Sequence, residues 1–359
     1  DALIDTKEFQ HVKITLGIPW RLGKRIQRFE FRNFSIRHLP VNPRITNRLK
    51  DYRLLPPLDA FFGKQVYVFP HFSIWPTMAS PSIPLIYDLS FVLDPEFSAD
   101  RNRIFLTQQA ELAAKRASKI ITISSNSKKE IVNHYGVNAK DVEIIYPITK
   151  SSEFYRRSES EIRNVRAKYG IFGKYILFVG NIEPRKNLIS LLKAYELLDD
   201  EEFGAYSLLL VGAKGWKDDE IHDQIKKLQK AGRKVIQPST YVLDEDLPAL
   251  FSGAEIFMYI SRYEGFGIPP VESMFCGTPV ISSDNSSLPE AVGDAALMVD
   301  SQDIPQIKNA IERLLADTGL RKSLIRKGYA HIKKPMFQAD NMARKFLKLA
   351  EHVNGGEIK

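Results

Sequence analysis

The sequence predicts an α/β protein built from two Rossmann-like, doubly wound domains. Short apolar, β-branched segments alternate with segments of helical periodicity along two stretches, separated by a charged and weakly patterned interval at residues 149–168. Such alternation is typical of parallel βα units, and 359 residues are enough for two ordinary domains. Ligands of doubly wound sheets bind at the carboxyl ends of the strands, so we expect a cleft between the two domains.

The predicted elements form two series and a final segment. The first domain is expected over residues 1–160, the second over 161–334, and a last helix over 335–359, after a break at Pro335. Strands are predicted at residues 85–87, 119–123, 142–146, 175–179, 207–211, 235–236, 256–259 and 279–282. Helices are predicted at residues 101–117, 125–135, 187–198, 219–231, 246–252, 270–275, 304–316 and 320–333, with another beginning at 288.

Positive charge is concentrated near the start of the chain. Residues 1–53 contain twelve Lys/Arg and five Asp/Glu, which accounts for +7 of the net charge of +8. Aromatic and apolar residues such as Trp20 and Phe29 are interleaved with these bases, which favours an anionic membrane surface as a partner. A solvated basic face is the alternative. No RNP, zinc-finger or KH pattern occurs, so nucleic acid is not an expected partner.

The composition disfavours several classes of protein. No run reaches 18 apolar residues, so no membrane-spanning segment is expected. The single cysteine, Cys276, excludes a disulfide framework and fits a reducing compartment. P-loop, zinc-protease and esterase motifs are absent. We therefore expect a cytoplasmic protein, with peripheral attachment to the inner face of the plasma membrane as a further expectation.

The first candidate motif is GNIEPRKN at residues 180–187, between a predicted strand and a predicted helix. A glycine turn, a helix start and two cations, Arg185 and Lys186, together make an anion site. These cations are suited to neutralising the charge on a diphosphate leaving group in place of a metal ion. A solvent-exposed turn with incidental bases is the alternative.

The second motif is EGFGIPPVE at residues 264–272, after the strand predicted at 256–259. Gly265 and Gly267 let the backbone approach a ligand closely, and the prolines suit a first helical turn. Glu272 in that turn is placed either to accept hydrogen bonds from ribose hydroxyls or to complement the helix dipole. Glu264 is either a ligand contact or an exposed loop acid.

Three weaker candidates accompany these motifs. Asp88 follows the strand predicted at 85–87, where it either faces the cleft or caps the next turn. His71 lies in an aromatic loop, a setting in which histidine is more often structural than functional. The D-x-D pattern at residues 244–246 precedes a helix, so capping is favoured over metal binding and no metal site is expected.

Ordered motifs between residues 175 and 296 resemble the retaining glycosyltransferases of family 4 (GT4), which have the GT-B fold, two Rossmann-like domains facing a cleft. The resemblance is carried by the two motifs above, by YVLDEDLPALFSGA at residues 241–254 and by LPEAVGDAA at residues 288–296. A weaker match spans residues 87–147. Within this family, its motifs most resemble those of bacterial mannosyltransferase-like enzymes of polysaccharide, O-antigen and lipopolysaccharide assembly.

The resemblance implies a role for each motif residue. Glu264 would lie beside the donor sugar, Arg185 and Lys186 at the diphosphate, and Glu272 at the ribose. The candidate catalytic residues are Glu264, Asp88 and His71. The candidate donor-binding residues are Gly180, Asn181, Arg185, Lys186, Val242, Leu243, Phe266, Gly267, Ile268 and Glu272. The family needs no metal or resident cofactor and retains anomeric configuration by front-face attack, and its final helix crosses back onto the first domain.

Three departures from the family pattern accompany the resemblance. Tyr87 stands where the family often has histidine before Asp88, and Thr240 stands where glycine often precedes the base-binding turn. The strand and glycine-rich loop that open the family are not found before residue 11. Either the first domain is incomplete at its start or that start has diverged.

The expected function is transfer of a hexose, mannose from GDP-mannose, to a glycan or lipid-linked glycan acceptor in polysaccharide or O-antigen biosynthesis. A GDP-sugar is favoured over a UDP-sugar. The alternatives are a UDP-sugar-dependent transferase of the same fold and a catalytically inactive GT-B interaction module.

Overall fold

The computed structural model describes residues 14–19, 34–39, 55–94, 100–149 and 151–355. The basic segment 1–53, predicted to contact an anionic membrane surface, lies outside the described residues except for two strands. These are β1 (Ile14–Pro19) and β2 (Phe34–Leu39), which pair in parallel and were not predicted from the sequence. The connection between them, where a glycine-rich loop would follow the first strand, also lies outside the described residues.

The second domain is built on a parallel sheet, which within the described residues has six strands in the order β12-β11-β10-β7-β8-β9. Its strands are β7 (Tyr175–Val179), β8 (Ser207–Val211), β9 (Val235–Ile236), β10 (Ile256–Tyr259), β11 (Val280–Ser283) and β12 (Ala296–Val299). The first five were predicted from the sequence. Strand β12 was missed because it is a short edge strand with two half-buried residues at its centre, which weakens the apolar pattern.

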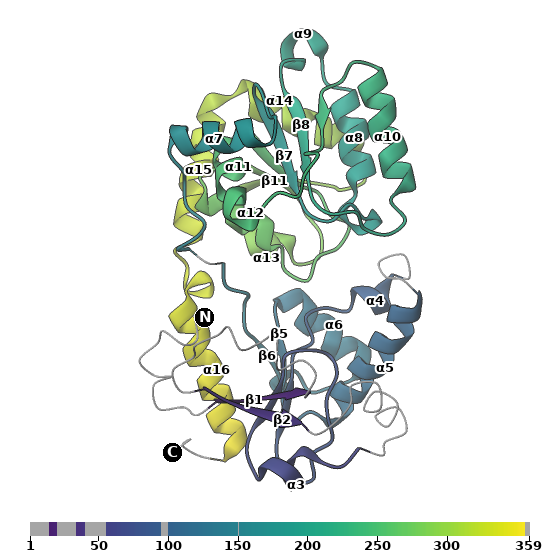
Figure 1. Ribbon diagram of the computed structural model, residues 1–359, viewed down its shortest axis with the longest axis vertical. Coiled ribbons are helices and arrows are strands. Elements are labelled where there is room, and N and C mark those ends of the chain that lie inside the picture. The colour runs from purple at the N-terminus through teal and green to yellow at the C-terminus, as the bar shows by residue number, and fades with distance from the viewer. Residues whose placement is uncertain (1–13, 20–33, 40–54, 95–99, 150, 356–359) are drawn as a thin grey trace.

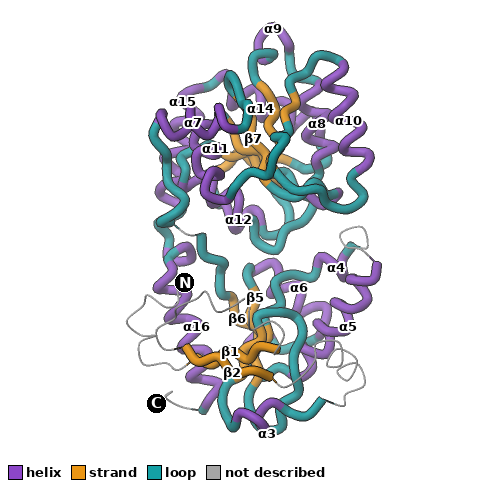
Figure 2. Tube along the Cα trace, in the orientation of Figure 1, coloured by secondary structure: helices purple, strands orange, loops and turns teal. Residues whose placement is uncertain are grey.

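Helices cover both faces of this sheet, as Figures 1 and 2 show. One layer contains α8, α10 and α14, which contact one another, and the other contains α7, α11, α12, α13 and α15. The helices are α7 (Glu159–Lys168), α8 (Leu188–Glu196), α9 (Asp200–Phe203), α10 (Asp219–Lys230), α11 (Leu247–Gly253), α12 (Ile268–Phe275), α13 (Leu288–Val292), α14 (Ile304–Ala316) and α15 (Thr318–His331). Both layers and the sheet share one continuous hydrophobic core, so this domain is a rigid base for the loops that leave its strands.

The charged, weakly patterned interval at 149–168, where the sequence analysis placed the domain boundary and predicted no helix, contains helix α7. The helix begins with a capping box, in which Ser158 and Glu161 bond reciprocally to each other's backbone N–H groups. It buries Ile162, whose Cγ2 lies where a Cβ on Gly253 of α11 would fall. A helix with one buried apolar residue among charges has little periodicity, which explains the error.

In the first domain, β3 (Tyr67–Phe69) pairs in parallel with β4 (Ser82–Pro84), and β5 (Ile120–Thr122) with β6 (Val142–Ile144). A bridge between Leu85 and Ile121 joins the two pairs. The strand predicted at 85–87 is therefore observed directly before that range, as β4, and of the predicted residues only Leu85 pairs with a neighbouring strand. The accompanying helices are α3 (Leu58–Phe62), α4 (Ser90–Leu93), α5 (Asp100–Arg116) and α6 (Ser125–Tyr135).

Helix α6 matters for the site because its amino end faces the second domain. Its cap is Ser124, whose hydroxyl accepts the Ser127 N–H, so the predicted cap at residue 125 or 126 is wrong by one position. Gly136 ends the helix in the left-handed conformation, as the sequence predicted.

The last helix, α16 (Ala339–Asn354), runs along the first domain, as Figure 1 shows. Leu349 packs with Ile83 and Ile121 of strands β4 and β5 in a separate hydrophobic cluster. Lys345 of α16 pairs with Glu143 of β6 at 2.7 Å. The last helix of the chain therefore packs on the first domain, although it follows the second domain in the sequence. In the described part of the chain, no helix has the length and apolarity needed to cross a bilayer.

We predict that Leu349→Ala lowers the free energy of unfolding by about 2–4 kcal/mol, because a largely buried leucine is removed from the cluster that fixes α16. Lys348→Ala is the matched control, since it changes the exposed neighbour on the same helix. Denaturant unfolding of both variants measures the difference. Equal stability of the two variants would contradict this assignment of α16.

Candidate active site

Two loops at the carboxyl ends of neighbouring strands form the centre of the candidate site. Strands β7 and β10 pair in the sheet, so the turn at 180–187 meets the loop that follows β10. Arg185 Nη1 donates to Glu264 Oε2 at 2.8 Å, and Lys186 Nζ donates to Glu264 Oε1 at 2.7 Å. The two sequence motifs are therefore one ion-paired cluster.

Further polar groups hold the two cations in place. Arg185 donates from Nε and Nη2 to Glu183 Oε1 at 3.1 and 2.8 Å, and from Nη1 to the Tyr263 carbonyl at 2.9 Å. Lys186 Nζ also donates to the Tyr259 hydroxyl at 2.6 Å. Glu183 and Tyr259 were not predicted from the sequence to belong to the site. An acid two residues before Arg185 was an available signal for Glu183, whereas Tyr259 could not be distinguished from an ordinary core residue of β10.

Glu264 is buried, with 6% of its surface exposed, and remains ionised. Burial alone would raise the pKa of its carboxyl, but the charges of Lys186 and Arg185 outweigh burial and lower this pKa to about 2. Burial acts to lower the pKa of Arg185, but Glu264 and Glu183 raise it above its usual value. Glu264 is therefore an anion throughout the neutral range, suited to holding cations and unsuited to proton transfer.

Close backbone packing shapes the turn at 180–187. Gly180 has φ 152°, and a Cβ on the neighbouring Gly212 would fall 1.8 Å from the Gly180 carbonyl oxygen, so only glycine fits there. Asn187 ends the turn in the left-handed conformation and donates from Nδ2 to the carbonyls of Ile260 and Ser301. Asn181 is exposed in the same turn. The packing leaves the main chain of this turn little freedom to move.

The glycine-rich part of the second motif brings the main chain close to the first domain. A Cβ on Gly265 would lie 2.7 Å from Asp88 Oδ2 of that domain. Gly267, with φ 106°, precedes α12 and packs against Leu288. Phe266 is buried and its ring lies 5.7 Å from that of Tyr146, so only its backbone is placed to meet a ligand. Ile268 is 39% exposed at the start of α12.

Glu272 is half-buried in α12, one turn beyond the glycines. Burial, together with the nearby charge of Asp244, raises the pKa of its carboxyl to about 7. Within the described residues, no hydrogen bond or ion pair engages this carboxylate. An acid of this kind gains most from a ligand that brings paired hydroxyl donors, as a ribose does.

In the turn at 240–246, the side chain of Val242 points into the protein and that of Leu243 points towards solvent. Val242 is buried, while Leu243 is 40% exposed and its backbone N–H donates to the Tyr169 hydroxyl at 3.1 Å. Asp246 accepts from Lys168 Nζ and Tyr169 Oη, each at 2.6 Å. One acid of the D-x-D pattern is thus held by a cation, and no cluster of three potential metal-ligating side chains occurs in the described part of the chain.

Asp88, Tyr87 and His71 contribute the wall formed by the first domain. Asp88 Oδ1 accepts the Ser90 N–H at 2.9 Å, as the capping alternative predicted, while its other oxygen lies against the main chain of Gly265 in the second domain. The Tyr87 hydroxyl donates to the Pro70 carbonyl at 2.8 Å. The adjacent His71 is exposed, and its ring packs edge-on against Phe72. Tyr87 therefore anchors the loop that presents His71.

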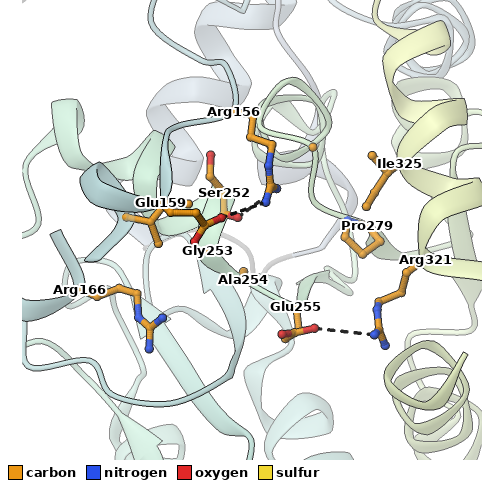
Figure 3. Close-up of a pocket in the computed structure, with 12 residues that line it drawn as sticks. Arg156, Glu159, Arg166, Ser252, Gly253, Ala254, Glu255, Pro279, Arg321 and Ile325 are labelled. Carbon is orange, nitrogen blue, oxygen red and sulfur yellow. Dashed lines mark hydrogen bonds and ion pairs between the residues drawn. The ribbon is translucent and has the colours of Figure 1, made fainter. Parts of the chain in front are cut away.

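A cavity of about 310 Å³ elsewhere in the second domain is separate from this site. Figure 3 shows Glu255 and Pro279 in its wall, which directly precede strands β10 and β11. The cavity thus opens at the amino ends of the strands, whereas the ion-paired cluster lies at their carboxyl ends. Arg321 and Glu255 face one another across it at 4.0 Å.

Comparison with known proteins assigns the class. A sequence model of the family described as "Glycosyl transferases group 1" matches residues 161–331. The O-antigen chain mannosyltransferase B of Escherichia coli is 34% identical over 291 residues, which cover 79% of this chain and 75% of that protein. The protein is therefore a glycosyltransferase, and the chain belongs to the group 1 family, GT4, as its motifs predicted.

A second relative shares part of its length with this chain. The serotype-specific mannosyltransferase WbdA of Escherichia coli is 28% identical over 245 residues, which cover 67% of this chain but 29% of that longer protein. The matched stretch therefore spans less than a third of WbdA.

Solved structures establish the GT-B fold. The Anabaena protein Alr3699/HepE, in complex with UDP-glucose, superposes with a TM-score of 0.71 at 17% identity, covering 97% of this chain and 94% of that one. Sucrose-phosphate synthase from Thermosynechococcus elongatus superposes with a TM-score of 0.67 at 21% identity, covering 87% and 78%. The predicted fold class is thus confirmed.

We predict that Glu272→Gln stabilises the protein at pH 8 but not at pH 4.5. The raised folded-state pKa means that the native carboxyl retains its proton at pH values where the unfolded chain has lost it, so the native state loses stability as pH rises from about 4.5 through 7. Glutamine removes this loss, and we expect a gain of about 1–2 kcal/mol at pH 8. Thermal unfolding across this pH range, with the exposed Glu245→Gln as control, measures it. A gain that is independent of pH would refute the assignment.

Proposed function

We propose that the protein transfers mannose from GDP-mannose to a glycan or lipid-linked glycan acceptor, with retention of anomeric configuration and without a metal ion. The observation that supports the proposal most is the cluster of Arg185, Lys186 and Glu264 at the carboxyl ends of β7 and β10. It combines fixed cations with a glycine-lined approach at the place where doubly wound sheets bind nucleotides.

Bond counting supports a role for the cations at a diphosphate. Of the five N–H groups of Arg185, four are used in the described structure, by Glu183, Glu264 and the Tyr263 carbonyl. Lys186 uses two of its three N–H groups, for Glu264 and Tyr259. Each cation retains one donor, and two charge-assisted bonds to phosphate oxygens would stabilise the charge that develops as the sugar leaves.

The carboxylates divide into different roles under this proposal. Glu264 stays ionised and holds the cations, so the proton of the acceptor hydroxyl must go elsewhere; a leaving phosphate is a suitable base. Glu272 would accept both hydroxyls of the donor ribose. Under the proposal, Asp88, which lies against Gly265, and the loop bearing His71, which Tyr87 anchors, would meet the sugar and the acceptor from the first domain.

The choice of mannose and of a glycan acceptor rests on the named relatives. Both relatives described above are mannosyltransferases of Escherichia coli, and one is named for O-antigen chains. A lipid-linked acceptor would lie at a membrane surface, and an anionic surface would attract the basic residues of segment 1–53.

We predict that GDP binds more tightly than UDP or ADP in calorimetry and that only GDP-mannose supports transfer in a screen of nucleotide sugars. Activity should persist in EDTA, and the anomeric signals of the product in NMR should match those of the donor. Binding of UDP in preference to GDP would overturn the choice of donor. Binding of no nucleotide would overturn the donor site as a whole.

We predict that Lys186→Ala reduces kcat by about 100-fold or more, because it removes one phosphate donor and leaves the buried Glu264 with a single cation. Glu272→Gln should instead weaken GDP binding, since one acceptor for the ribose is lost, with a smaller effect on kcat. Lys193→Ala, an exposed lysine of α8, is the control. Steady-state kinetics together with calorimetry separate the two effects. Unchanged kcat in Lys186→Ala would contradict the proposed site.

A further inference from the structure

Helix α6 and strand β6 of the first domain extend to the loops of the second domain that carry Glu264. On α13, the Glu290 carboxylate accepts the Ser125 N–H at 2.8 Å, the Ser125 hydroxyl at 2.7 Å and the Tyr146 hydroxyl at 2.6 Å. Ser125 is the first residue of α6, so its N–H has no partner within the helix and the helix dipole favours a negative charge there. An acid of one domain thus completes a helix of the other.

A second bridge runs beside the first. Tyr263 donates from its hydroxyl to Glu130 Oε2 at 2.6 Å, and Asn126 Nδ2 donates to Glu130 Oε1 at 2.7 Å. Burial and the nearby acids Asp88 and Glu130 raise the pKa of the Tyr263 hydroxyl, which therefore remains a donor. Because Tyr263 directly precedes Glu264, its bond to Glu130 ties the position of the ion-paired cluster to the position of α6.

The main chain of Glu264 is itself held by the segment that begins α13. Its N–H donates to the Ser286 hydroxyl at 3.0 Å, and its carbonyl accepts from the Ser287 hydroxyl at 2.7 Å. Ser286 has φ 50°, a left-handed conformation that costs free energy in a residue with a side chain. Glu290 lies four residues beyond Ser286 and three beyond Ser287, so the contact between α6 and Glu290 is linked to Glu264 through one short stretch of chain.

We propose that Glu290 is a positioning residue for the transfer reaction: by binding Ser125 and Tyr146 it draws the 263–267 loop against Asp88 and sets Glu264 relative to the first domain. The inference rests on the proposed function, in which the donor binds the second domain and the acceptor meets the first. Glu290 need not touch either substrate. Its three hydrogen bonds hold the two domains together, and this contact fixes the ion-paired cluster of Glu264 in position relative to Asp88 of the first domain.

The test compares Glu290→Gln, Glu290→Ala and Tyr146→Phe with Glu312→Gln, whose glutamate pairs with Lys308 inside α14. At saturating donor, we expect the Glu290 variants to lower kcat by about 10- to 100-fold, since a small misplacement of reacting groups is enough for this. The Kd for GDP should stay within about threefold of wild type, because the donor contacts lie within the second domain. The double variant Tyr146→Phe/Glu290→Gln should be less impaired than the product of the two single effects predicts.

Solution scattering gives a readout that does not depend on the reaction. Glu290→Ala should increase the radius of gyration relative to wild type and Glu312→Gln, because the domains part. Unchanged kcat and unchanged scattering in Glu290→Ala and Tyr146→Phe would overturn the proposal, as would a loss of GDP affinity in proportion to kcat. If Glu290→Ala does not fold, Tyr146→Phe decides alone, since it keeps the aromatic ring beside Phe266. If no nucleotide binds the wild type, the proposed function fails, whereas the scattering result still judges the role of Glu290.

Discussion

The pairing of Glu264 with Arg185 and Lys186 is the interaction on which the rest of the site depends. A carboxylate and two cations taken out of water lose several kcal/mol of hydration each, and only close, hydrogen-bonded pairing offsets that loss. The cluster meets this condition because each carboxylate oxygen of Glu264 accepts from a different cation and Glu183 supports Arg185 from the other side. Removal of one partner leaves a buried charge uncompensated, so the two loops must be built and kept together.

This dependence determines the character of the ligand site. The fixed acids neutralise part of the charge of these cations and leave N–H groups that point in set directions. Such groups favour a phosphate bound at one position over nonspecific binding of anions. The glycines let the main chain approach the same place. At the far end of the motif, Glu272 is held in surroundings that oppose its ionisation, so it gains from hydroxyl donors. The loop thus carries Glu264, which is ion-paired, and the helix that follows carries Glu272, which has no partner among the described residues.

In the described part of the chain, hydrogen bonds join the two domains, and Ile123 and Tyr146 of the first domain also pack against the hydrophobic core of the second. The second domain carries the cations and the acids, while the first contributes Asp88, the loop anchored by Tyr87 and the amino end of α6. Helix α16 returns to the first domain and packs on β4 and β5, so the halves are joined by chain at two places. Each domain also has a hydrophobic core of its own, so the position of one domain relative to the other depends on these contacts and on the two chain connections.

The α/β class, five strands of the six-stranded sheet, most helices and the family could be predicted from the sequence, because these follow from apolar periodicity and from motifs of fixed spacing. The sequence did not determine α7, whose single buried residue leaves little pattern, or the edge strand β12. It also assigned Arg185, Lys186 and Glu264 to separate contacts on the donor, whereas the structure joins them directly. This contact depends on the sheet topology, because residues 78 and 79 positions apart meet through the pairing of β7 with β10. The bonds of Glu290 to Ser125 and Tyr146 likewise depend on how the two domains pack against each other, and no local pattern encodes that packing.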